Sequence, residues 1–146
     1  MLQCFVYSES YSGTGSTVFA PIIAYSDKRS FGLGAEITHY SMITNLSINY
    51  IKYSDSAHGR DELFSGYIGF GIFNVATAQI GYNSDESFTG RIHGDLGIYS
   101  MIKGEPAFFA SNGDDKNTIK DNLLLDYSVG YERSGIFGSI GLGFGF

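Results

Sequence analysis

The chain has 146 residues, with Tyr 11, Phe 12 and Gly 20 but only Pro 2 and no Trp. This length fits a single domain over residues 1–146, and the aromatic and glycine content is typical of β structure rather than of a disordered segment. The formal net charge of −6 provides no basic surface, so we expect no nucleic-acid partner.

The first residues carry no strong pattern. Leu2–Ser10 could form a ninth strand or an extended arm. Met1–Tyr7 has no basic start, long apolar centre or small-residue cleavage site, so we do not expect it to be a signal peptide. Cys4 is the only cysteine, which excludes an internal disulfide. Gly13–Thr17 lacks the Lys of a phosphate-binding loop and predicts a hairpin turn.

From Thr17 onward the apolar residues recur with a period of two, which indicates strands, and no convincing helical period is present. We expect eight strands. They span Thr17–Ser26, Ser30–Ser41, Ile43–Ser54, Leu63–Phe73, Val75–Asn83, Phe88–Ile102, Asn122–Arg133 and Gly135–Phe146. Between the sixth and seventh, Lys103–Asp121 predicts a turn-rich insertion. Its Asp114, Asp115 and Asn117 lack the spacing of a calcium loop.

The two faces of these strands differ in an unusual way. One face is apolar, while the other carries mainly Gly, Ser, Asn and Tyr instead of the Lys, Glu and Thr expected where a sheet meets water. Few charged residues lie well inside the strands: Glu9, Glu36, Lys52, Arg91, Asp95 and Asp126. No run reaches the roughly twenty apolar residues of a membrane-spanning helix. We therefore predict an all-β, eight-stranded antiparallel up-and-down transmembrane barrel, apolar outside and small or polar inside.

Charged residues of the polar face form the first candidate site. Arg91, His93 and Asp95 alternate in one strand, so their side chains share a face, with neighbours ~7 Å apart. With Glu36, Asp126 and Glu132 they could form an interior charge network. A structural set of paired charges is the favoured interpretation, and a proton-sensitive or ion-conducting interior is the alternative. The histidines and Cys4 are too scattered for a zinc motif, so we expect no metal or other cofactor.

The last strand carries the most specific pattern. Leu142, Phe144 and the final Phe146 alternate with glycines that include Gly141. This resembles the C-terminal β-signal read by the bacterial outer-membrane assembly machinery, although Ile140 stands where a polar residue is expected. The resemblance implies that this machinery is a partner. More broadly, the chain resembles the small eight-stranded outer-membrane barrels of the adhesion, serum-resistance and anchor type.

A second resemblance concerns catalysis. His39 and Ser41 form a His-x-Ser on the apolar face and look like the pair found in outer-membrane lipid A deacylases. The resemblance implies a general base at His39 and a nucleophile at Ser41. Met42 and Tyr53, however, stand where that family has Asn and an acidic residue. The alternative is that the pair marks a polar strand end at the membrane interface, so an enzyme is less expected than a non-enzyme.

These observations favour a monomeric barrel of the bacterial outer membrane, in contact with membrane lipid or lipopolysaccharide. Its role would be structural, adhesive or recognitional at the cell surface. The connections Asp55–Glu62 and Asp85–Glu86 are the first candidates for contact with a host or surface ligand. Side chains would fill the lumen, so we expect no general diffusion pore. A lipid-modifying hydrolase using His39 and Ser41, and a secreted ligand-binding or membrane-active toxin domain, remain the alternatives.

Overall fold

The computed structural model describes residues 16–41, 43–57, 59–71, 75–103, 123–133 and 135–146. Its elements are β1 (Ser16–Ser26), β2 (Ser30–Tyr40), β3 (Thr44–Ala57), β4 (Arg60–Phe70), β5 (Thr77–Asn83), β6 (Phe88–Gly97), α2 (Ile98–Lys103), β7 (Leu123–Glu132) and β8 (Gly135–Gly145). Leu2–Ser10, Cys4 and the interior of the insertion at Lys103–Asp121 lie outside the described residues. Within these residues, no helix combines the length and the apolar character needed to cross a membrane.

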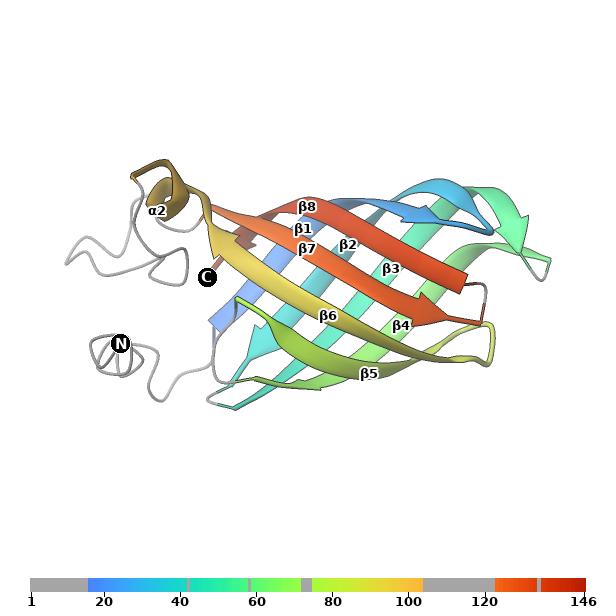
Figure 1. Ribbon diagram of the computed structural model, residues 1–146, viewed down its shortest axis with the longest axis horizontal. Coiled ribbons are helices and arrows are strands. Elements are labelled where there is room, and N and C mark those ends of the chain that lie inside the picture. The colour runs from blue at the N-terminus through green and yellow to red at the C-terminus, as the bar shows by residue number, and fades with distance from the viewer. Residues whose placement is uncertain (1–15, 42, 58, 72–74, 104–122, 134) are drawn as a thin grey trace.

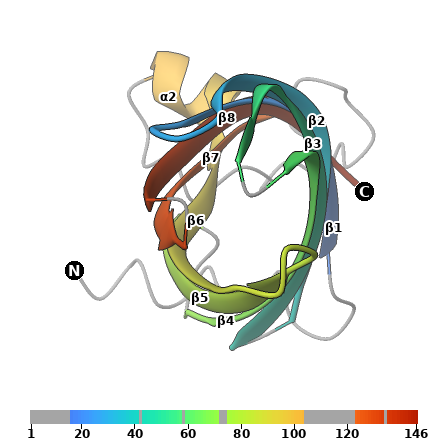
Figure 2. The same ribbon diagram turned by 90° about the vertical axis from the view of Figure 1, so that its right-hand side faces the viewer.

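The strands form a closed barrel in the order β1 to β8, and every neighbouring pair is antiparallel (Figures 1 and 2). The predicted eight-stranded antiparallel up-and-down barrel is therefore confirmed. The β1–β2, β3–β4, β5–β6 and β7–β8 connections lie at one end, which we call the hairpin end; it faces the viewer in Figure 2. The C-terminus and α2 lie at the opposite end, which we call the terminal end.

The ring closes where β1 meets β8. Thr17 and Phe146 exchange two backbone hydrogen bonds of 3.0 and 2.9 Å, and the pairing resumes from Ile22 opposite Gly141. At Gly141 a Cβ atom would lie only 2.5 Å from the carbonyl oxygen of Pro21. Glycine at this position of the predicted assembly signal thus permits the close approach of the first and last strands.

Several predicted strand boundaries differ from the observed ones by one or two residues, such as Thr77 for the predicted start at Val75, and two need a larger correction. The strand expected over Phe88–Ile102 ends at Gly97, and Ile98–Lys103 is helical. Gly97 is the last residue of β6 with a partner on β7, where it pairs with Leu124. The expected connection Asp55–Glu62 is mostly a projecting hairpin, because β3 continues to Ala57 and β4 starts at Arg60 (Figure 1).

The barrel interior combines a small apolar cluster with many polar groups. Inward-facing Ala20, Ile22 and Ala24 of β1 pack with Ile51, Tyr53 and Leu63 of β3 and β4. Elsewhere the buried side chains are largely polar or charged, including Glu36, Asn49, Gln79, Arg91 and His93. This is the reverse of a soluble barrel, in which the dry interior is the apolar side.

Candidate functional site: an apolar wall around a charged interior

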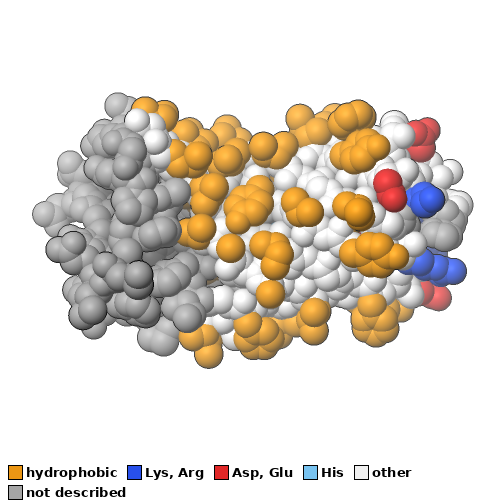
Figure 3. Space-filling view, viewed as in Figure 1, with side chains coloured by type: hydrophobic (Ala, Val, Ile, Leu, Met, Phe, Trp, Pro, Cys, Tyr) orange, Lys and Arg blue, Asp and Glu red, His pale blue; other side chains and the backbone are white. Residues whose placement is uncertain are grey.

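The outer wall of the barrel is covered by large apolar side chains (Figure 3). On the middle of the strands these are aliphatic, and Leu33, Ile48 and Ile80 have exposed fractions of 68%, 63% and 67%. A soluble monomer rarely exposes so many large apolar side chains. Asp126 and Ser65 are buried while Phe70 and Phe144 face outward, so the apolar face expected to contact lipid is the outer one.

Aromatic residues border this aliphatic belt. Towards the hairpin end, cross-strand ring pairs lie with centroids 4.7 to 5.2 Å apart, namely Tyr25–Phe31, Tyr50–Phe64 and Tyr82–Phe88. Towards the terminal end, Phe19, Phe70, Phe144 and Phe146 are exposed. Two aromatic girdles flanking an apolar band are the pattern of transmembrane β-barrels. Charged side chains gather beyond the first girdle, at the hairpin end (Figure 3).

A buried ion pair crosses the barrel interior. Arg91 of β6 donates from Nη1 and Nη2 to the two carboxylate oxygens of Glu36 on β2, each at 2.7 Å. Both side chains are almost completely buried. The guanidinium also donates to Gln79 at 2.5 Å and lies 3.7 Å from the centre of the Tyr67 ring. Two parallel hydrogen bonds from Arg to a carboxylate are the strong form of this interaction.

Next to this pair, the structure brings His93, Asp95 and Asp126 together. His93 Nδ1 lies 3.3 Å from Glu36 Oε1, while Nε2 lies 3.6 Å from Asp95 Oδ2 and 4.0 Å from Asp126 Oδ2. Asp95 and Asp126 face each other directly across β6 and β7. Five of the six residues expected in the interior network are thus neighbours.

The sixth, Glu132, belongs to a separate cluster at the hairpin end. Arg29, from the β1–β2 connection, donates to Glu132 at 2.7 Å and to Asp85 at 3.0 Å. Asn83 donates to the second Glu132 oxygen at 3.1 Å. The cluster links the β1–β2 and β5–β6 connections to the end of β7. Sequence analysis missed Arg29 because a residue in a turn has no strand parity to indicate where its side chain points.

Asp85 makes the hairpin-end cluster sensitive to acid. Burial acts to raise the pKa of Asp85, but hydrogen bonds from Ser87 and Arg29 and the Arg29 charge outweigh it and lower the pKa below the usual 3.8. Its contribution to stability is therefore present above pH ~4 and is lost as the pH falls through the lowered value. We expect Asp85→Asn to flatten the decrease in unfolding free energy below pH ~4, measured by urea unfolding between pH 2 and pH 7. An unchanged acid profile would contradict this assignment.

The two residues of the His-x-Ser pair lie on the outer surface, towards the terminal end. His39 and Ser41 are both exposed. His39 Nδ1 lies 3.0 Å from the hydroxyl of Thr17, and no ion pair joins His39 to a carboxylate among the described residues. The position at which a catalytic triad needs an acid is thus taken by a hydroxyl group.

The remaining predicted residues lie on the surfaces expected for them. Leu142, Phe144 and Phe146 of the predicted assembly signal face outward near the terminal end. The projecting hairpin at residues 54–62 carries exposed Asp55, Arg60, Asp61 and Glu62. Lys52 lies 3.4 Å from Glu62 and 4.0 Å from Asp61 at its base.

Comparison with known proteins adds little. No family model matches the chain, and no curated protein matches it. Among solved structures, the chain is similar to the one titled "Solution NMR structure of de novo designed TMB2.3". The match has 13% identity and a TM-score of 0.44, and covers 91% of this chain and 96% of that one.

Proposed function

We propose that this protein is a barrel embedded in a bacterial outer membrane, with a structural, adhesive or recognition role performed through its hairpin end. The observation that carries the proposal is the outer wall, whose aliphatic belt lies between two aromatic borders. Lipid is the solvent in which such a wall is stable, and a closed sheet leaves no backbone group without a partner. The polar interior supports the same proposal, because its charges are shielded from hydrocarbon.

The hairpin end is the part suited to recognition. The charged hairpin at residues 54–62 projects past the aromatic border, and the Asp85–Glu86 turn lies at the same end (Figure 1). At the level of Arg91, the side chains of Glu36, Gln79 and Tyr67 contact the guanidinium and occupy part of the lumen. Binding at the surface therefore fits this barrel better than solute diffusion through it. Leu142, Phe144 and Phe146 would present the assembly signal to the outer-membrane machinery.

Folding into lipid tests the proposal. When urea-unfolded protein is diluted into phosphatidylcholine vesicles, we expect β-sheet circular dichroism and a band whose migration on a gel changes on boiling. Dilution into buffer without lipid or detergent should give aggregates, because the apolar wall would face water. The boiled sample provides the unfolded reference. A folded, monodisperse monomer in detergent-free buffer would contradict membrane insertion and favour a secreted β domain.

A further inference from the structure

Several buried oxygen atoms in the barrel interior have no hydrogen-bond partner among the described residues. Both carboxylate oxygens of Asp126 are in this position, and so is Oδ1 of Asp95. The two side chains have exposed fractions of only 1% and 0%. A buried carboxylate without hydrogen bonds is expensive, so each such group calls for a ligand or another explanation.

The charges at this place do not balance. Arg91 holds both oxygens of Glu36 and neutralises it. Within the described part of the chain, His93 is then the only basic group within 4.0 Å of Asp95 and Asp126. With a neutral imidazole, this set has a formal charge of about −2 if both carboxyl groups are ionised. One divalent cation would make it neutral. A protonated histidine would do so only if Asp95 and Asp126, which face each other, also shared one proton.

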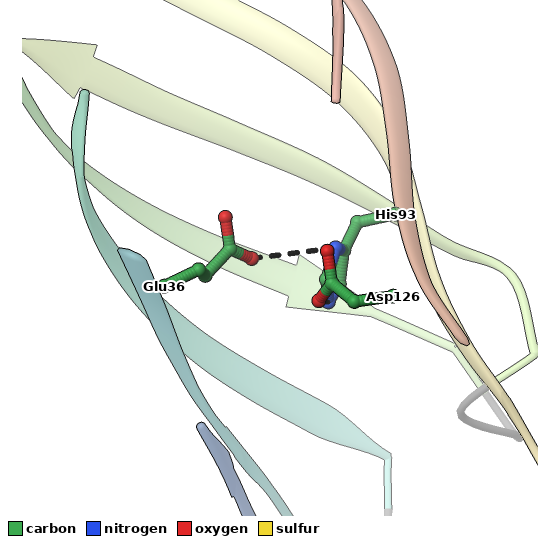
Figure 4. Close-up of side chains that lie close together, drawn as sticks. All are labelled: Glu36, His93 and Asp126. Atoms are coloured by element: carbon green, nitrogen blue, oxygen red, sulfur yellow. Dashed lines mark ion pairs between the residues drawn. The ribbon is translucent and has the colours of Figure 1, made fainter. Parts of the chain in front are cut away.

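His93 is oriented as a metal ligand would be. Its Nδ1 lies 3.3 Å from Glu36 Oε1 without forming a hydrogen bond among the described residues, and the ring lies beside Asp126 (Figure 4). Nε2 lies near Asp95 and Asp126 and 3.0 Å from the Tyr40 hydroxyl, a contact that a bound ion would replace. A ligating histidine usually directs its second nitrogen to a carboxylate, which fixes the ring. Glu36 fits that outer role because Arg91, Thr38 and Asn49 already donate to it. Tyr40 similarly orients Asp95 through a hydrogen bond of 2.5 Å.

The distances suit a small cation. Nε2 of His93 lies 3.6 Å from Asp95 Oδ2 and 4.0 Å from Asp126 Oδ2. In a tetrahedral site with bonds of ~2.1 Å, neighbouring ligand atoms are about 3.4 Å apart. A modest contraction would bring Nε2 to that spacing from each of the two carboxylate oxygens. Glu36, His93 and Asp126 also offer ligand atoms within 4.8 Å of one another.

We propose that His93, Asp95 and Asp126 bind one divalent transition-metal ion of the zinc class inside the barrel, with Glu36 and Tyr40 as outer positioning residues. Imidazole nitrogen selects such ions over Mg²⁺ and Ca²⁺, which prefer all-oxygen sites. The proposed role is to fasten β6 to β7 next to the Arg91–Glu36 pair. The site depends on the interior alone, so it holds whether the outer wall faces lipid or a detergent micelle.

Calorimetric titration tests this inference. The full chain is refolded in detergent micelles in chelator-treated buffer and titrated with ZnCl₂, and separately with CaCl₂. We expect one Zn²⁺ per chain and no comparable Ca²⁺ binding. Asp126→Asn should weaken Zn²⁺ binding on the order of 100-fold or more, since changes to outer residues alone cost about 10–100-fold. Asp61→Asn, which removes an exposed carboxylate from the projecting hairpin, is the matched control and should bind like the unchanged protein.

Each variant must also report on folding. Asp126→Asn removes a charge that lacks a hydrogen-bond partner, so without metal it should unfold at the same or a higher urea concentration than the unchanged protein. Added Zn²⁺ should raise the unfolding midpoint of the unchanged protein but not that of Asp126→Asn. His93→Gln should likewise lose binding. Absence of saturable Zn²⁺ binding, or equal binding by Asp126→Asn, would overturn the site; equal binding would instead indicate a surface group such as the exposed His39.

Discussion

Replacing Arg91 with methionine is expected to destabilise the barrel by about 3–5 kcal/mol, because it leaves Glu36 charged and buried without its partner. The loss should be aggravated by Asp95 and Asp126, whose negative charges lie on the other side of His93. Methionine keeps much of the apolar volume of the arginine stem, so the effect reports mainly on charge. Urea unfolding of the protein in vesicles or micelles gives the measurement.

The double variant Arg91→Met with Glu36→Gln is the control for that experiment. Replacing both members of a buried ion pair is often neutral or even stabilising, whereas removing one is not. We therefore expect the double variant to recover most of the stability lost by Arg91→Met. If the two variants are equally unstable, the arginine acts through its contacts with Gln79 and Tyr67 and not through neutralising Glu36.

Arginine in place of Ile48 is expected to cost about 2–4 kcal/mol in a lipid bilayer, the range for a charge on a barrel wall near the bilayer midplane. Ile48 has an exposed fraction of 63% and pairs with Ile37 on β2. It lies in the aliphatic belt, between the Tyr50–Phe64 ring pair and the terminal-end border at Phe70. Reversible urea unfolding in thin-bilayer vesicles would measure the change.

The position of the new arginine along the barrel axis shows whether the loss of stability comes from contact with lipid. Tyr82→Arg changes an outward residue beside the hairpin end, where Tyr82 packs on Phe88. At such an interface the cost should fall to about 0–1 kcal/mol, apart from the lost ring contact. In a water-exposed wall, by contrast, Ile48→Arg would change stability by only about 0.5 kcal/mol. That outcome would contradict the proposal that the outer wall contacts membrane lipid.

Strand parity explains why the sequence was informative about the fold. Successive strand residues point to opposite faces, so the sequence alone places Glu36, Arg91 and Asp126 on the inner face. The alternation also predicted eight strands and the outward position of Phe70 and Phe144. These features follow from local pattern and barrel closure, and neither requires knowledge of distant contacts.

Strand parity does not predict how far along the barrel axis a side chain lies. It also does not predict where the side chains of turn residues point. Glu132 shares the inner face with Asp126, but it lies further toward the hairpin end and pairs with Arg29. Arg29 itself belongs to a connection, where the period of two ends. His93, Asp95 and Asp126 were predicted to lie in the interior network, but not as metal ligands. A search for histidine and cysteine spacing does not find one histidine with a carboxylate from its own strand and one from the neighbouring strand.

The pairing of β1 with β8 has a consequence for how this protein would insert into the membrane proposed for it. Val18 of β1 pairs with Gly145 of β8, so the contacts that close the barrel join the two ends of the described sequence. An intermediate in which β8 is not yet paired would expose peptide N–H and C=O groups of β1 and β7 to hydrocarbon, which cannot form hydrogen bonds with them. In the proposed membrane, insertion and ring closure would then be one coupled event. That event would be slow, because the contacts that complete the barrel join residues far apart in the sequence. A half-inserted open sheet would have no stable place in the membrane.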